Sequence, residues 1–108
     1  MTAIDLNKEL FDKYTNDTSK PVLVDFWAPW CVYCRRIAPG LNILAEQYKD
    51  ILVIGKINID DEQDLAVKEQ IEVIPTLVIY QGEQALGSIV APESKAQIEA
   101  FIKETLHI

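Results

Sequence analysis

The run Val-Leu-Val-Asp-Phe-Trp-Ala at residues 22–28 constrains the fold most, because nearly every residue in it is apolar or β-branched. Such a run is typical of a strand that is covered on both faces in the middle of a sheet. Three residues later, Cys31 begins an amphipathic pattern in which Cys34, Ile37 and Leu41 recur at helical spacing. A buried strand that leads directly into an amphipathic helix indicates an α/β fold.

Weaker patterns complete an order of strands and helices that reads βαβαβαββα. They predict a short strand at 3–4, a helix through Leu6, Leu10, Phe11 and Tyr14, a strand at 51–59, a short helix at 64–70, strands at 76–80 and 84–90, and a helix from Ser94 to about residue 106. The turn-forming residues 81–83 make the last two strands antiparallel, with the second at an edge of the sheet. The cluster at 60–62 and Ser94 are expected to cap the helices that follow them. We therefore expect a central mixed sheet of about five strands flanked by four helices, in one domain spanning residues 1–108.

Charge and hydropathy narrow the classes of partner. The net charge of −7 repels phosphate backbones and anionic lipid surfaces, so nucleic acids and membranes are poor partners. No apolar run approaches the roughly 18 residues of a membrane span, and the first residues do not resemble a secretory signal. We expect a cytoplasmic protein, monomeric and acting on other proteins or small solutes.

Both cysteines of the chain lie in one Cys-x-x-Cys motif, Cys31 and Cys34, at the start of the predicted helix. Residues three apart share a helical face, so a disulfide forms there without moving the backbone. The helix start lowers the pKa of the Cys31 thiol and predicts that it is the nucleophile, with the deeper Cys34 as the resolving thiol. The alternatives are half of a zinc site, for which only His107 remains as a further ligand, two cysteines without chemistry, or a cluster bridged between subunits.

Four segments resemble the thioredoxin family in their order and spacing: DFWAPWCVYC at 25–34, RRIAP at 35–39, KINID at 56–60 and IPT at 74–76. The resemblance implies a thioredoxin fold and a thiol–disulfide oxidoreductase that reduces protein disulfides through a redox-active Cys31–Cys34 disulfide, with no bound cofactor. It implies an NADPH-dependent thioredoxin reductase as electron donor. It also implies that Pro75 forms a cis peptide bond facing the cysteines, and that Ile74 binds the substrate chain as an added strand.

Asp25 is notable because its carboxylate stands among apolar residues of the predicted central strand. Burial raises the pKa of a carboxyl group, which suits Asp25 for passing a proton to or from Cys34. The resemblance also implies that Lys56 tunes the charge of Asp25. Trp27 and Trp30 match the two tryptophans that precede the cysteines in the family, and Trp30 is expected to contact substrates.

The chain departs from the family pattern between the cysteines, where Val32 and Tyr33 replace the usual Gly-Pro. Neither side chain supplies a positive charge to stabilise the thiolate, so we expect a reduction potential between about −270 and −200 mV. Val73 and Val90 are bulkier than the small residue and the glycine expected at the substrate groove. The residues expected to contact substrates are thus Trp30, Val32, Tyr33, Val73, Ile74, Pro75 and Val90. Glutaredoxin-like reduction of glutathione mixed disulfides, which Tyr33 favours, and a non-catalytic binding module are the alternative functions.

Overall fold

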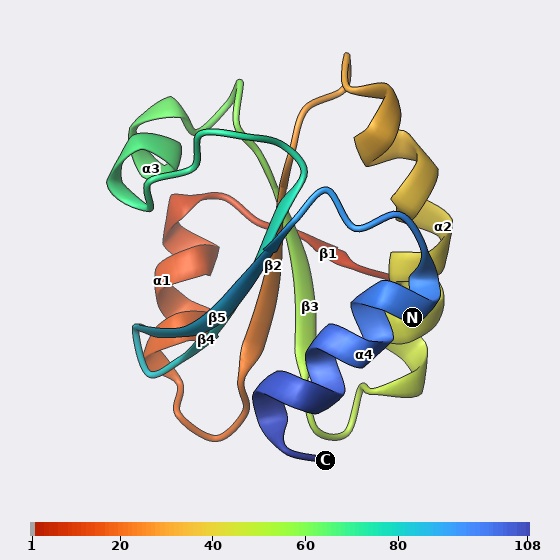
Figure 1. Cartoon of the computed structure of the whole chain (residues 1–108). Coiled ribbons are helices and arrows are strands. Elements are labelled where there is room, and N and C mark those ends of the chain that lie inside the picture. Colours follow the sequence, from red (N-terminus) through yellow and green to blue (C-terminus); the bar gives the residue numbers. More distant parts are fainter. Residues whose placement is uncertain (1) are drawn as a thin grey trace.

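The computed structural model describes residues 2–108, and these residues follow the predicted order of elements (Figure 1). The strands are β1 (Ile4–Asp5), β2 (Val22–Trp27), β3 (Val53–Asn58), β4 (Thr76–Gln81) and β5 (Gln84–Val90). The helices are α1 (Lys8–Asn16), α2 (Val32–Gln47), α3 (Gln63–Lys68) and α4 (Lys95–Leu106). The predicted fold class, a mixed five-stranded sheet with four helices, is confirmed.

The strands form one sheet in the order β1-β3-β2-β4-β5, with β2 in the middle. Strands β1 and β2 both run parallel to β3, whereas β4 runs antiparallel to β2 and to β5. Val24, for example, has Gly55 of β3 on one side and Val78 of β4 on the other. The run at 22–28 therefore does form the central strand, and β5 is an edge strand as predicted.

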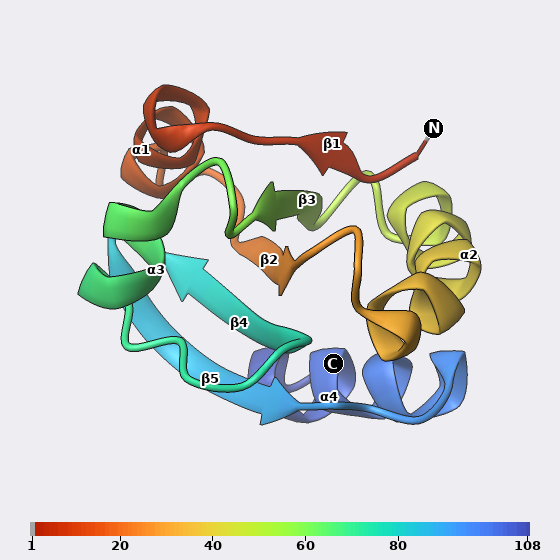
Figure 2. The same ribbon diagram turned by 90° about the horizontal axis from the view of Figure 1, so that it is seen from above.

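Helices α1 and α3 cover one face of the sheet, and α2 and α4 cover the other, as the view from above shows (Figure 2). The alternation of side chains along β2 divides the core accordingly. Val22, Val24 and Phe26 pack with residues of α1 and α3, whereas Leu23 packs with residues of α2 and α4. The odd-numbered residues of β2, Asp25 and Trp27 included, therefore stand on the face that α2 covers.

The predicted strand at 51–59 is shorter in the structure, because its first residues belong to the turn that follows α2. The N–H groups of Ile51 and Leu52 both donate to the carbonyl oxygen of Tyr48, at 3.0 and 2.9 Å. Ladder pairing begins only at Val53. Backbone groups that satisfy a helix C-terminus are not available to a sheet, and this competition sets where β3 begins.

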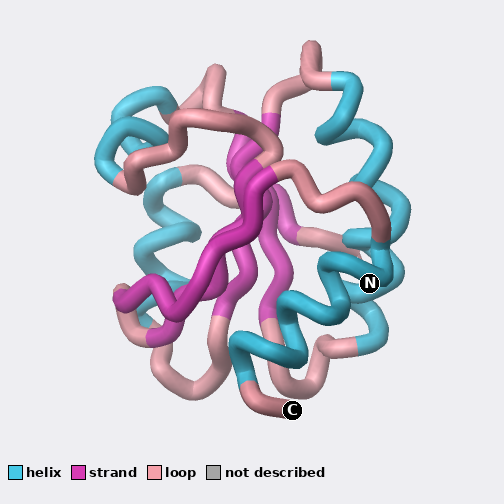
Figure 3. Tube along the Cα trace, in the orientation of Figure 1, coloured by secondary structure: helices cyan, strands magenta, loops and turns pink. Residues whose placement is uncertain are grey.

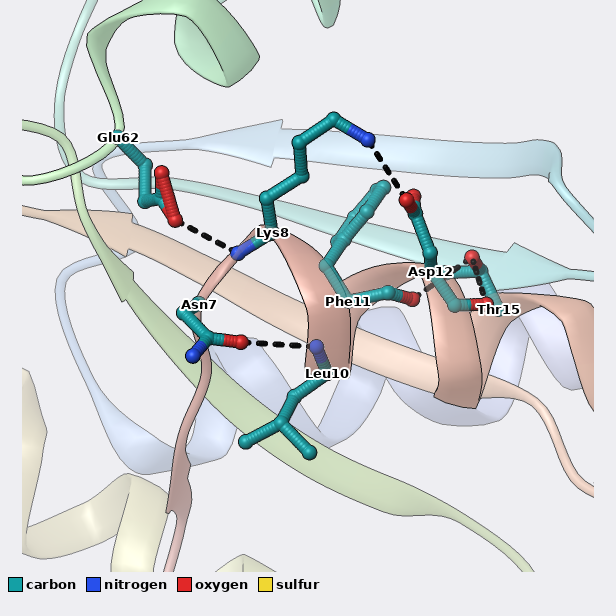
Figure 4. A network of polar contacts seen from close by, with 7 residues as sticks. All are labelled: Asn7, Lys8, Leu10, Phe11, Asp12, Thr15 and Glu62. Carbon is teal, nitrogen blue, oxygen red and sulfur yellow. Dashed lines mark hydrogen bonds and ion pairs between the residues drawn. The ribbon is translucent and has the colours of Figure 1, made fainter.

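The predicted cap cluster at 60–62 does not cap α3 through the side chain of its N-cap residue. Glu62 is the N-cap of α3 but makes no side-chain cap hydrogen bond there. Its carboxylate instead accepts the backbone N–H of Lys8 at 2.6 Å, at the start of α1 (Figure 4). Ser94 caps α4 as predicted, with its hydroxyl oxygen accepting the N–H of Gln97 at 3.1 Å.

Several loops gather at the end of the sheet where α2 begins, at the top of Figures 1 and 3. They are the loop at 28–31 after β2, the loop at 59–62 after β3, and the loop at 69–75 before β4. The loop at 91–94 after β5 lies at the same end. Within residues 2–108, no helix is long and apolar enough to cross a bilayer.

Candidate active site

Cys31 and Cys34 form a disulfide at the start of α2, with their Cα atoms 5.3 Å apart. Cys31 is the N-cap of α2, and its sulfur accepts the backbone N–H of Cys34 at 3.1 Å. A backbone N–H group that has no partner within the helix, and the positive end of the helix dipole, are thus directed at this sulfur. Cys31 is 8% exposed and Cys34 is 2% exposed, so the predicted difference in depth is confirmed.

Asp25 is 1% exposed, which confirms its predicted burial. Among residues 2–108, neither of its carboxylate oxygens has a hydrogen-bond partner. Burial raises the pKa of Asp25 to about 7, against a smaller opposing effect of the positive charge on Lys56. An uncharged carboxylic acid and a carboxylate are therefore both accessible to Asp25 near neutral pH.

Lys56 is the Cα partner of Asp25 in the neighbouring strand β3. Its ammonium nitrogen lies 4.3 Å from the centre of the Trp27 ring, in a cation–π contact. The half-buried Trp27 in turn packs against the cluster formed by Ala28, Cys31 and Cys34. The structure thus brings Lys56, Asp25 and Trp27 together beneath the start of α2.

The peptide bond between Ile74 and Pro75 is cis, as the family resemblance implies. Ile74 is half-buried and packs against the cluster that contains both cysteines. The carbonyl oxygen of Pro75 accepts the N–H of Ala91 at 2.8 Å, and the hydroxyl of Thr76 donates to the carbonyl oxygen of Val73. These bonds fix the loop before β4 and the end of β5 next to each other, beside the disulfide.

Exposed apolar side chains occur at the loop end of the sheet. The predicted substrate contacts among them are Trp30, Val32, Tyr33, Val73 and Val90. Trp30 is 63% exposed, so it is not a core residue. Asp60, which the sequence did not indicate as a site residue, accepts the indole N–H of Trp30 at 3.1 Å. Its position in the 56–60 segment, directly after β3, was the available signal.

The two arginines after Cys34 have separate contacts. Arg35 donates to the carbonyl oxygen of Pro29 at 2.8 Å and ties the start of α2 to the preceding loop. The guanidinium of Arg36 lies 5.8 Å from the centre of the Tyr33 ring. Tyr33, which replaces the usual proline, is therefore paired with a cation on the exposed side of α2.

The backbone at the end of β5 places the glycine-favouring position one residue later than the sequence comparison indicated. Val90 is a strand residue paired with Thr76. Ala91, not Val90, has a φ of 46°, in the left-handed region. Only glycine adopts this conformation without a steric cost, so the strained residue at the groove is Ala91.

A cavity away from the cysteines does not include the predicted site residues. Within residues 2–108, no group of three or more His, Cys, Asp or Glu side chains is placed to hold a metal ion. A cavity of about 720 Å³ lies between β5 and α4, and none of the predicted site residues lines it.

Comparison with known proteins agrees with this geometry. A model of the protein family described as Thioredoxin matches residues 2–104. The thioredoxin of Buchnera aphidicola subsp. Baizongia pistaciae is 37% identical over 99 residues, which are 92% of this chain and 91% of the relative. The thioredoxin of Acidithiobacillus ferridurans is 39% identical over 101 residues, which are 94% of each chain.

A third relative carries two activities in its name. The bifunctional thioredoxin reductase/thioredoxin of Mycobacterium leprae is 38% identical over 81 residues, which are 75% of this chain and 18% of that protein. The two thioredoxins match nearly the whole chain, and the structure contains the Cys-x-x-Cys disulfide at a helix start. The chain belongs to the thioredoxin family and is a thiol–disulfide oxidoreductase that reduces protein disulfides.

Proposed function

We propose that Cys31 is the nucleophile and Cys34 the resolving thiol of this reductase. The Cys31 thiolate attacks one sulfur of a substrate disulfide, and the other substrate sulfur leaves as a thiolate that takes up a proton. Cys34 then attacks the Cys31 sulfur in the mixed disulfide and releases the second substrate thiol. The substrate gains two electrons and two protons, and the protein is left with the Cys31–Cys34 disulfide.

One observation carries this assignment: the sulfur of Cys31 accepts the N–H of Cys34 at the first turn of α2. A negative charge on that sulfur is stabilised by the same donor and by the helix dipole. Cys34 lies deeper and has no such donor among the described hydrogen bonds. The more exposed and better stabilised thiolate therefore meets the substrate.

Asp25 is proposed to take the proton from the Cys34 thiol as that thiol attacks. A base works best when its pKa is near the working pH, and burial brings the pKa of Asp25 to about 7. Its side chain stands on the face of the sheet that α2 covers, the helix that carries Cys34. Lys56 is proposed to tune this proton affinity through its positive charge.

Substrates are proposed to lie along the loop before β4. We propose that an extended segment of the substrate pairs with the backbone of this loop, where Ile74 packs against the cysteine cluster. The exposed apolar side chains around this loop offer contacts that depend little on sequence. They are Trp30, Val32, Tyr33, Val73 and Val90.

Electron supply and cellular setting are further parts of the proposal. The fusion of a thioredoxin reductase to a thioredoxin in the M. leprae protein supports an NADPH-dependent reductase as the electron donor. The two cysteines carry the electrons themselves, so the proposed cycle uses no bound cofactor. We propose that the protein is a monomeric electron carrier in which residues 1–108 act as one domain. We also propose that it works in a reducing compartment such as the cytoplasm. The net charge of −7 supports protein partners over nucleic acids and membranes.

The test is a turnover assay on insulin disulfides, with NADPH and either thioredoxin reductase or glutathione with its reductase. We expect turnover with thioredoxin reductase, and its loss in Cys31→Ser. Cys34→Ser is expected to accumulate a mixed disulfide with substrate, which mass spectrometry detects. Turnover sustained only by glutathione would support the glutaredoxin-like function instead. Equal rates for the wild-type protein and Cys31→Ser would contradict the proposal.

A further inference from the structure

Lys56 stands between two aspartates on neighbouring strands of the sheet. Its Cα partners are Asp5 of β1 on one side and Asp25 of β2 on the other. Paired residues of neighbouring strands place their side chains on the same face, so both carboxylates stand on the same face as the Lys56 side chain. Nevertheless, no ion pair of Lys56 occurs among the described residues, and its ammonium lies 4.3 Å from the centre of the Trp27 ring.

Trp27 is well placed to compete for this ammonium. It is two residues after Asp25 on β2, so the two side chains stand on the same face. Its side chain also packs against the cluster of Ala28, Cys31 and Cys34. A cation over a partly buried indole face is attracted as strongly as in many surface ion pairs. The ring therefore offers Lys56 a fixed alternative to the aspartates.

We propose that Trp27 is a positioning residue that holds the Lys56 ammonium away from Asp25 and thereby keeps Asp25 able to retain a proton. The other groups around Asp25 do not replace this control. Its partner on β4 is the apolar Leu77, and the cysteines of α2 are uncharged in the disulfide. Asp5 is exposed and lies beyond Lys56. Lys56 is thus the one charged Cα partner of Asp25.

The placement has a consequence for the proton affinity of Asp25. Coulomb energy falls with distance, so an ammonium held on the ring stabilises the Asp25 carboxylate less than one in direct contact. Removal of the indole frees Lys56 to approach Asp25 and favours the ionised carboxylate. The acid dissociation constant of Asp25 should then rise. This prediction concerns only the positions of the three side chains, while its importance for turnover rests on the proposed role of Asp25.

A double-mutant cycle tests the coupling in the oxidised protein. The carboxyl ¹³C shift of Asp25 is followed against pH by NMR in the wild type, Trp27→Leu, Lys56→Met and the double variant. We expect Lys56→Met to lower the acid dissociation constant of Asp25 at least about threefold more in the Trp27→Leu background than in the wild type. A Trp27→Leu effect of the same size with and without Lys56 would mean that the ring only excludes water, and would overturn the proposal.

Trp27→Phe provides the conservative comparison and a second route if Trp27→Leu does not fold. It keeps a smaller aromatic face, so we expect the coupling to Lys56 to lie between those of the wild type and Trp27→Leu. A coupling in Trp27→Phe equal to that in the wild type would show that the indole face is not what holds the ammonium. Asp25→Asn with unchanged kcat/KM would contradict the proposed catalytic role of Asp25, yet it would leave the measured coupling intact. A negative result for the catalytic role of Asp25 is therefore distinguishable from a negative result for the coupling between Trp27 and Lys56.

Discussion

The backbone N–H of Cys34 lies 3.1 Å from the sulfur of Cys31, so one helical turn links the two cysteines by a hydrogen bond as well as by the disulfide. The donor belongs to the backbone of α2, so we expect it to remain in place when the disulfide is reduced. It then faces a sulfur that has become a thiol or a thiolate. A charged acceptor forms the stronger hydrogen bond, so the fold favours the thiolate of Cys31.

The reduced protein should therefore be alkylated first at Cys31. Iodoacetamide reacts with thiolates, and Cys31 is both the more exposed cysteine and the one stabilised by a backbone donor. At pH 7 we expect Cys34→Ser to be modified at least about tenfold faster than Cys31→Ser. The two variants each contain one cysteine and serve as matched controls for each other. Mass spectrometry that finds Cys34 modified faster would contradict the assignment of the nucleophile.

Asp25→Asn should stabilise the protein at alkaline pH. The pKa of Asp25 is about 7 in the folded protein and about 3.8 in the unfolded chain, so between these values the folded state binds more protons. The contribution of Asp25 to stability is therefore fully present below about pH 3.8 and is lost as the pH rises through 7. At pH 8 we expect a gain for Asp25→Asn of the order of 3 kcal/mol relative to the gain at pH 4, measured by urea unfolding.

The pH dependence separates this effect from a change in packing. A buried asparagine lacks hydrogen-bond partners at every pH, so its desolvation shifts the stability difference by a constant amount. A stability difference that does not change between pH 4 and pH 8 would show that Asp25 is not a carboxyl group with a raised pKa. Asp5→Asn, an exposed change on the other side of Lys56, is the matched control for the loss of a carboxylate.

Local patterns were sufficient to predict the order of elements and the position of the cysteine pair at the start of α2. The apolar run at 22–28 has no other stable place than a central strand, and Cys31 precedes a clear helical repeat. The edge strand β5 and the Ser94 cap also follow from local rules and are confirmed. Each of these features depends on residues that are close together in the chain, so a short sequence window is enough to predict it.

The contacts that refine the site could not be predicted because they join distant segments. Trp30 and Asp60 are 30 residues apart, and their hydrogen bond depends on where two loops meet in space. The preference of Lys56 for the Trp27 ring over Asp25 depends on rotamers, which register alone does not determine. The left-handed backbone at Ala91 arises where β5 turns toward α4.

Asp60→Ala should weaken the reduction of protein substrates without affecting small ones. The carboxylate of Asp60 fixes the indole of Trp30, an exposed ring that we propose as a docking surface. A hydrogen bond of this kind at the surface contributes up to about 1 kcal/mol, so we expect kcat/KM for insulin to fall about threefold. Asp60→Asn retains an acceptor oxygen and should keep most of the rate. An equal loss for a small aromatic disulfide would point to damage at the cysteines instead.

Ala91→Gly should stabilise the protein, whereas Val90→Gly should destabilise it. The φ of 46° at Ala91 costs an L-residue about 1 kcal/mol, and glycine removes this cost. The net gain is smaller, because glycine also makes the unfolded chain more flexible. Val90 ends β5 in a ladder with Thr76, where glycine costs about 1 kcal/mol. The free energies of unfolding in urea should therefore change in opposite directions at two adjacent positions. Destabilisation by Ala91→Gly together with stabilisation by Val90→Gly would contradict this assignment and restore Val90 as the site where glycine fits.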